Sequence, residues 1–321
     1  MRRALPFRPH RAAGYTLVEL MVTLVLTLLL LAAGFSFYMM SRSSYATIDD
    51  NANLQERGNF AMSVVTRLLR QTAFTPPSKD EQGSGGLMVV QDPMLSGLDR
   101  CAAPTVAPDA NELEQLTCGQ GAAINNSDAV MIRFFGNSDD TNKPDGSTID
   151  CSGQAVAGYT DQGQAARQRG LAVLYVGAGA SGKPALKCRY RPRDAAGQEL
   201  LDDPLADEEL VPGVESFQLL YGVTVNGDMV PDKYVAAAAM NATDWKNVVT
   251  VKVAMVIRAD NASADAAGPG SFSLFGTLGA NVADATFQPA QDLKSARKLF
   301  TATVQLHNYL SCFEGDPACY F

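Results

Sequence analysis

A long uncharged run near the N-terminus limits what this chain can fold into. Residues 20–40 carry no charged side chain. As a helix rising about 1.5 Å per residue the run reaches roughly 30 Å, the thickness of one bilayer core. Four arginines and no acid lie in the first fourteen residues, whereas the chain as a whole has a net charge of -8. Basic residues stay on the cytoplasmic side, so we predict a single-pass membrane protein with its N-terminus inside.

One acid, Glu19, stands at the start of this apolar run. An unpaired charge within hydrocarbon costs roughly 2.5 to 3.5 kcal/mol on insertion scales, so such a residue is expected to have a function. A secretory signal peptide cut after Ala32-Ala33-Gly34 does not account for it, because the apolar run continues to Met40. A plain membrane anchor fits the length of the run but leaves Glu19 unexplained.

The helix is expected to continue beyond the membrane. Residues 42–72 contain no proline, and apolar side chains recur on one helical face at Ala61, Val64, Val65, Leu68 and Leu69. The prolines at 76 and 77 end this pattern. The sequence therefore predicts one helix of about 60 residues, transmembrane and then amphipathic.

Most later periodic segments are typical of β-strands, because apolar and polar residues alternate between turn residues. The strongest are residues 248–258 and 214–225; the weaker ones are 87–91, 129–135, 171–176, 185–191 and 300–306. Residues 137–168 and 259–291 are predicted to be long connections. The predicted fold is α+β, a long N-terminal helix packed on a predominantly antiparallel β body, with no second domain required.

Six cysteines form an even set, and none belongs to a Cys-x-x-Cys pair. Behind a membrane-targeting N-terminus they favour disulfides in an oxidising compartment. Six cysteines allow 15 connectivities. Sequence neighbours suggest Cys101 with Cys118, Cys151 with Cys188, and Cys312 with Cys319.

Charge and motifs argue against several functions. An acidic chain does not attract phosphate backbones, so no nucleic acid is expected to bind directly. Residues 177–184 nearly match a P-loop, but Pro184 replaces the magnesium-binding Ser or Thr, and we predict a hairpin loop. Residues 137–146 are rich in oxygen ligands without the register of a calcium loop, which leaves a site of another geometry open. The two histidines, His10 and His307, belong to no catalytic motif, so no catalytic residue, metal or cofactor is predicted and the chain is not expected to be an enzyme.

The N-terminus resembles the class III signal of type IV pilins and pseudopilins. A basic leader ends in Gly14, Tyr15-Thr16-Leu17-Val18-Glu19 follows, and then the apolar helix begins. The resemblance implies that a prepilin peptidase cuts after Gly14 and N-methylates Tyr15. It also implies that Glu19 pairs with the terminal ammonium of a neighbouring subunit, so that Thr16 and Glu19 set helix packing and register. The expected segments are a cleaved cytoplasmic leader (1–14), a transmembrane half-helix (15–41), an amphipathic half-helix (42–75) and a periplasmic β-rich domain (76–321).

Two later segments resemble the PilW-type minor pilins of Gram-negative bacteria. They are residues 244–251, a late strand that opens with Trp245, and residues 297–308, in which His307 stands where the family pattern has arginine. The resemblance implies a protein of the inner membrane and then of the pilus tip, which primes pilus assembly. The filament itself could serve motility, cell adhesion, DNA uptake or secretion. Its expected partners are other minor pilins, a tip adhesin, the prepilin peptidase and the inner-membrane assembly machinery.

Two alternatives remain open. A J-type minor pseudopilin of a type II secretion system has a similar build, and a membrane-tethered ligand-binding or enzymatic domain is less favoured. In the secretion family the outermost subunit lacks the glutamate. The presence of Glu19 therefore implies a position below another subunit.

Overall fold

The computed structural model describes residues 14, 16–76, 94–108, 114–158, 168–194, 197–200, 203–262 and 270–308. The chain divides into two compact units, Met1–Asp49 and Asp50–Phe321. Helix α1, Leu17–Gln71, contributes residues to both units. The second unit contains all the strands and is called the body below.

The body is built mainly from strands. Its elements after α1 are β1 (Leu95–Leu98), β2 (Thr105–Pro108), β3 (Glu114–Thr117), η1 (Ile124–Asn126), β4 (Ala129–Phe134), β5 (Gly170–Ala178), β6 (Pro184–Tyr190), β7 (Ala206–Pro212), β8 (Val214–Val223), β9 (Lys233–Val235), η3 (Ala237–Ala239), α3 (Ala242–Lys246), β10 (Val248–Ala262), β11 (Phe272–Ser273), η4 (Gly276–Asn281), β12 (Thr286–Phe287) and β13 (Ser295–Gln305).

Two antiparallel sheets form the framework of the body. One has the order β1-β4-β5-β6-β7 and the other the order β13-β10-β8-β9, and two short ribbons pair β2 with β3 and β11 with β12. A long helix with an antiparallel β body confirms the predicted α+β class.

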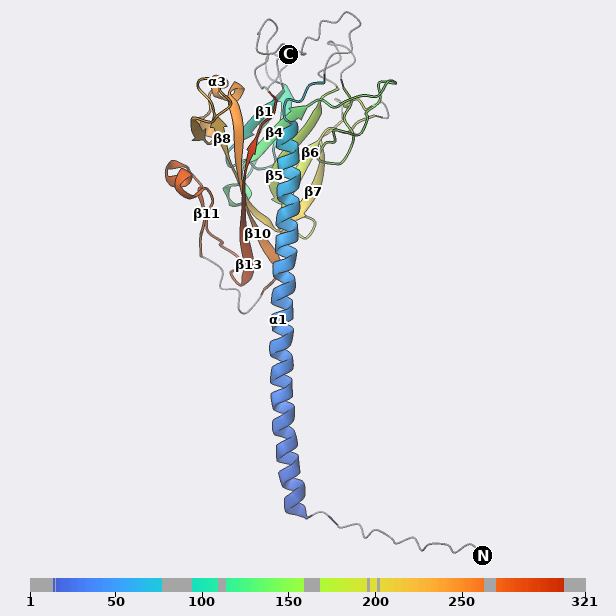
Figure 1. The fold of residues 1–321 in the computed structure, drawn as a ribbon, viewed down its shortest axis with the longest axis vertical. Coiled ribbons are helices and arrows are strands. Elements are labelled where there is room, and N and C mark those ends of the chain that lie inside the picture. The colour runs from blue at the N-terminus through green and yellow to red at the C-terminus, as the bar shows by residue number, and fades with distance from the viewer. Residues whose placement is uncertain are drawn as a thin grey trace, which may run out of the picture. The chain divides into compact units, whose positions relative to one another are not determined.

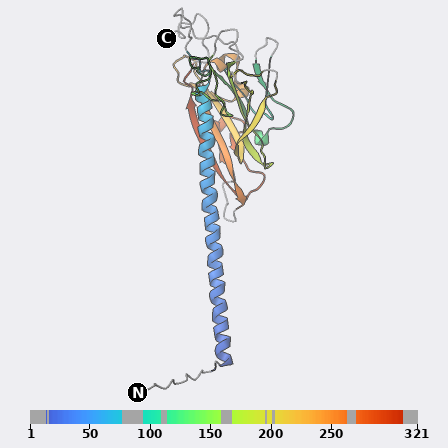
Figure 2. The ribbon, with the colours of Figure 1, turned by 90° about the vertical axis from the view of Figure 1, so that its right-hand side faces the viewer.

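The part of α1 that belongs to the body packs against both sheets. Figure 1 shows β6 and β7 on one side of this part of the helix and β10 and β13 on the other, and Figure 2 shows the strands alongside it from a second direction. The apolar face predicted from sequence is the buried one: Ala61, Val65, Leu68 and Leu69 are fully buried in a core shared with both sheets. The amphipathic pattern in the sequence therefore predicted correctly which face of α1 packs against the sheets.

A glycine sets the distance between α1 and β13. A Cβ atom at Gly58 would lie 2.0 Å from Cζ of Phe300, a buried residue of β13. Only a residue without a side chain allows the ring to lie against the helix backbone.

Most of the strongly alternating segments became strands. β10, β8, β4, β5, β6 and β13 all overlap their predicted ranges. The predicted strand at 87–91 lies outside the described residues. The helix stops at Gln71, before the two prolines, because the chain begins to pair with β4: Ala73 N donates to Arg133 O at 2.9 Å and Phe135 N to Phe74 O at 2.8 Å.

Other expectations about the β body were wrong. Residues 259–291, predicted as one connection, contain the end of β10 together with β11, η4 and β12. β1, β2, β3, β7 and β9 were not foreseen. β7 carries Asp207, Glu208 and Glu209 and so lacks an apolar pattern, but it is an edge strand, where charged residues are well tolerated.

Candidate functional site

The N-terminal motif forms the first turn of α1. Thr16 precedes the helix, and its Oγ1 accepts a hydrogen bond from Glu19 N at 3.3 Å while its carbonyl accepts one from Leu20 N at 3.1 Å. A threonine in this position satisfies backbone donors that a helix start leaves open. The carboxylate of Glu19 in this first turn suits the positive end of the helix dipole. Gly14 lies just before the turn, and Tyr15 lies outside the described residues.

The surface that follows is apolar and uncovered. Leu17 to Met40 present large apolar side chains that are each about half exposed or more, from Met39 at 48% to Leu17 at 75%. One 18-residue window of α1 has a mean hydropathy of 2.4, and none of it is buried. By length and composition this helix can cross a membrane. The surface needs lipid or other apolar helices around it.

The threonine and serine hydroxyls within this apolar segment are satisfied by the helix itself. Thr23 donates to Leu20 O at 2.9 Å, Thr27 to Thr23 O at 2.7 Å, and Ser36 to Ala32 O at 2.9 Å. Such bonds to the preceding turn let hydroxyls enter an apolar environment at low cost.

Glu19 differs from these residues. It is exposed, and among the described residues it forms no ion pair. The site can therefore offer one carboxylate, at a helix start, to a cation that comes from elsewhere.

Two disulfides stabilise the body. Cys101 is bonded to Cys118 with Cα atoms 5.3 Å apart, and Cys151 to Cys188 with Cα atoms 6.3 Å apart. These are the pairs that sequence neighbours suggested. The third expected pair, Cys312 with Cys319, lies outside the described residues.

The segments that resembled ligand sites have structural explanations. The near P-loop is the tight connection between β5 and β6, in which Ala178 pairs with Pro184 and Gly179 N donates to Lys183 O at 2.8 Å. In residues 137–146 the carboxylate of Asp139 accepts hydrogen bonds from the backbone of Thr141 and Lys143, which shapes the loop. Across the described ranges no group of three His, Cys, Asp or Glu residues could hold a metal ion. His307 lies exposed just after β13.

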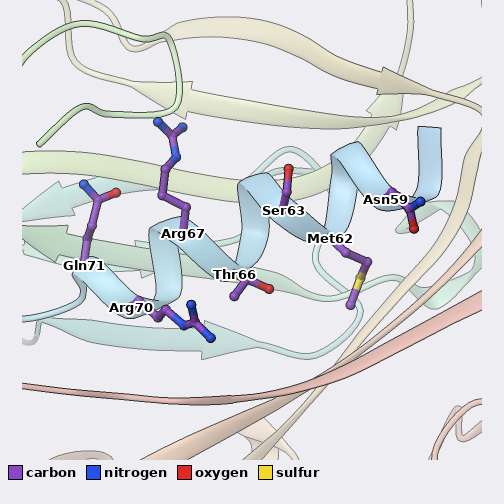
Figure 3. A pocket seen from close by; sticks show the side chains of 7 residues that line it. All are labelled: Asn59, Met62, Ser63, Thr66, Arg67, Arg70 and Gln71. Atoms are coloured by element: carbon purple, nitrogen blue, oxygen red, sulfur yellow. The ribbon is translucent and has the colours of Figure 1, made fainter. Parts of the chain in front are cut away.

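A groove lies along the outer half of α1. It is lined by Asn59, Met62, Ser63, Thr66, Arg67, Arg70 and Gln71, all from one helix. Figure 3 shows Arg67 and Arg70 pointing to different sides of the helix, so their charges do not converge on one point. A ligand site needs convergent polar groups, and this groove lacks them.

Sequence reasoning missed a buried charge cluster in the sheet of β4. Arg133 is fully buried, and its Nη1 lies 2.8 Å from Glu199 Oε1; Arg191 and Arg193 contact the same carboxylate at 3.4 and 3.5 Å. Burial lowers the pKa of Arg133 to about 9, although Glu199 acts against the shift. No sequence pattern marks these residues, because a buried ion pair depends on contacts between distant segments.

Together, the capped first turn, the exposed apolar helix and the antiparallel body that covers its outer half define a pilin-type protein. Family comparison agrees: the model for the prokaryotic N-terminal methylation motif matches residues 9–35, and the model for type IV pilus-assembly protein W matches residues 173–308. By these two matches the chain is similar to type IV pilin-like proteins of the PilW type. No curated protein matches its sequence.

The second match covers the segments that carried the resemblance. It includes Trp245, which lies in α3 directly before β10 and packs edge-on against Tyr221 with ring centroids 4.7 Å apart. It also includes β13 with Phe300. The tryptophan thus lies in the short helix directly before the late strand, and its ring packs against Tyr221 of the neighbouring strand β8.

Proposed function

We propose that this membrane-anchored pilin is a minor pilin that helps prime assembly of a type IV pilus and lies near its tip. The observation that carries the proposal is Glu19, an acid without an ion-pair partner among the described residues, at the start of the apolar part of α1, whose large side chains are each about half exposed or more. A carboxylate in such a setting is favourable only when a cation joins it. In a filament the terminal ammonium of a neighbouring mature chain supplies that cation.

The proposal includes processing and topology. The prepilin peptidase removes residues 1–14, and N-methylated Tyr15 becomes the first residue. Residues 15–41 span the inner membrane, residues 42–75 form the amphipathic half of the helix, and residues 76–321 form the periplasmic domain. The body acts by binding other pilins and assembly proteins, and not by catalysis. The match to a pilus-assembly family model supports a pilus over a secretion system.

The test replaces Glu19 with Val. We expect normal cleavage to Tyr15, measured by intact mass of the protein from membranes, and normal folding of the body. We expect the amount in sheared pili to fall roughly tenfold or more, because the packing charge is lost. The matched control is Thr23→Val, which removes a hydroxyl that bonds only to its own helix and should be incorporated normally.

Two results would contradict the proposal. Wild-type incorporation of Glu19→Val would exclude the charge pairing. A mature chain that begins at Phe35, or still at Met1, would exclude processing as a pilin.

A further inference from the structure

The loop between β8 and β9, residues 224–232, exposes apolar side chains. Val225 is 73% exposed and Val230 is 58% exposed. In the described part of the body the other large apolar residues that are more than half exposed are Leu293 at 67% and Phe60, on α1, at 52%. Apolar side chains presented to water contribute little to the stability of the fold, and exposed apolar surface often marks contacts with other proteins.

The shape of this β8–β9 loop is fixed by its own side chains. Its backbone N–H groups donate to them at Val225 (to Asp232 Oδ2, 2.8 Å), Gly227 (to Thr224 Oγ1, 3.1 Å), Asp228 (to Asn226 Oδ1, 3.1 Å) and Val230 (to Asp228 Oδ1, 3.0 Å). Met229 has a φ of 61°, which is costly for a residue other than glycine. An ordered loop loses little conformational entropy when it binds, so this one is already arranged for contact.

The β8–β9 loop lies at the end of the body where α1 ends. Thr224 N donates to Asn247 O at 3.0 Å, beside the start of β10; Leu306 N donates to Val249 O at 2.9 Å. Two residues further on, Asn308 Nδ2 donates to Thr72 O at 2.8 Å, just after α1.

The opposite end of β10 marks the other end of the body. There Asn261 Nδ2 donates to Asp50 Oδ1 at 2.9 Å, where α1 enters the body. Figure 1 shows α3, which immediately precedes β10, at the end of the body where α1 stops. In a filament whose helices all point their N-termini toward the membrane, this end faces the subunit nearer the tip.

The side chains of the β8–β9 loop indicate what kind of surface a partner must present. The carboxylates of Asp228 and Asp232 belong to the same loop as the two valines, and neither forms an ion pair within the described ranges. A complementary surface needs an apolar recess for the valines and cationic groups around it. We propose that Val225 and Val230 dock into an apolar recess, bordered by Lys or Arg, on the pilin-type subunit next toward the tip. This inference rests on the proposed role in the filament.

The first experiment compares two full-length variants in the native strain. Val225→Ser with Val230→Ser removes the apolar contact, and Leu293→Ser is the matched control, a similarly exposed apolar residue outside the loop. Both should melt like wild type in detergent, because exposed side chains contribute little to stability. The double variant should be at least several-fold depleted in sheared pili, whereas the control should be incorporated normally. Wild-type incorporation of the double variant would overturn the proposal.

A second measurement does not depend on the serine variants folding. A photoreactive amino acid at position 225 should form one adduct, with another subunit that carries an N-methylated pilin terminus, and the same probe at position 293 should not. No adduct at 225, or equal adducts at both positions, would exclude the contact. If Glu19→Val fails to incorporate while the serine variant succeeds, only the loop contact is wrong; if Glu19→Val incorporates normally, the role in the filament is wrong.

Discussion

Asp128 is a buried carboxylate, and its burial disfavours the ionised form. It is 3% exposed, and its oxygens accept hydrogen bonds from Leu219 N at 2.9 Å and Arg100 N at 3.3 Å. Burial, and then the nearby charge of Asp99, raise its pKa well above the usual value, and the two backbone donors offset only part of this. Ionising Asp128 therefore opposes folding.

Replacing this residue with Asn should change how stability depends on pH. Because the folded-state pKa is raised, the stabilising contribution of Asp128 is complete below the unfolded pKa of about 3.9 and is lost as pH rises through the folded pKa. We expect the melting temperature of Asp128→Asn, relative to wild type, to rise as pH increases from 4 to 8, measured by thermal scans of the full chain.

Asp139 provides a control, because its replacement should change the pH dependence of stability in the opposite direction. At Asp139 hydrogen bonds from the Thr141 hydroxyl and from backbone N–H groups lower the pKa, so its contribution appears above the unfolded pKa. Asp139→Asn should therefore lose stability, relative to wild type, as pH rises toward about 4, and this difference should change little from there to pH 8. Parallel pH profiles for the two variants would refute the assignment of a raised pKa to Asp128.

At the scale of elements, the contact between α1 and β13 depends on Gly58. Gly→Ala inside a helix ordinarily stabilises by about 0.5–1 kcal/mol. Here the added Cβ meets the ring of Phe300, so we expect Gly58→Ala to lose about 1–3 kcal/mol in denaturant unfolding.

Two further variants separate a clash from an effect of helix propensity. Gly58→Ala combined with Phe300→Leu should be less destabilised than the sum of the single changes, since the two sites are in contact. Ser63→Ala, on the exposed face of the same helix, should change stability by less than about 0.5 kcal/mol. A stabilised Gly58→Ala variant would show that the helix and β13 are not this close.

At the scale of the whole molecule, the two disulfides should be reduced at different stages. Cys118 is exposed, whereas Cys151 and Cys188 are both buried. We expect Cys101–Cys118 to be reduced in the native state and Cys151–Cys188 only on unfolding, followed by alkylation and peptide mass spectrometry. The second bond also closes the longer loop, 37 residues against 17. Its loss should cost about 4 kcal/mol, against about 3 for the first. Simultaneous reduction of both bonds in the folded protein would contradict this order.

The sequence alone determined the features that depend on nearby residues. The capped first turn with Glu19, the apolar run, the amphipathic face of α1 and the alternating strands β8 and β10 all follow from side-chain period and local chemistry. The disulfide pairs Cys101–Cys118 and Cys151–Cys188 also agreed with sequence neighbours. The N-terminal motif could be located because its function needs residues in fixed register along one helix.

Tertiary structure decided the features that depend on distant segments. β7 became a strand despite its acids because it pairs with the edge of β6, and Ala73 and Phe74 left the helix because β4 offers them hydrogen-bond partners. Arg133 and Asp128 are buried by neighbours far along the chain, and the β8–β9 loop with its exposed valines comes to the end of the body where α1 ends only once β8, β10 and β13 have paired. Which polar groups are buried, and which apolar groups remain in solvent, is fixed by contacts between segments that no local pattern encodes.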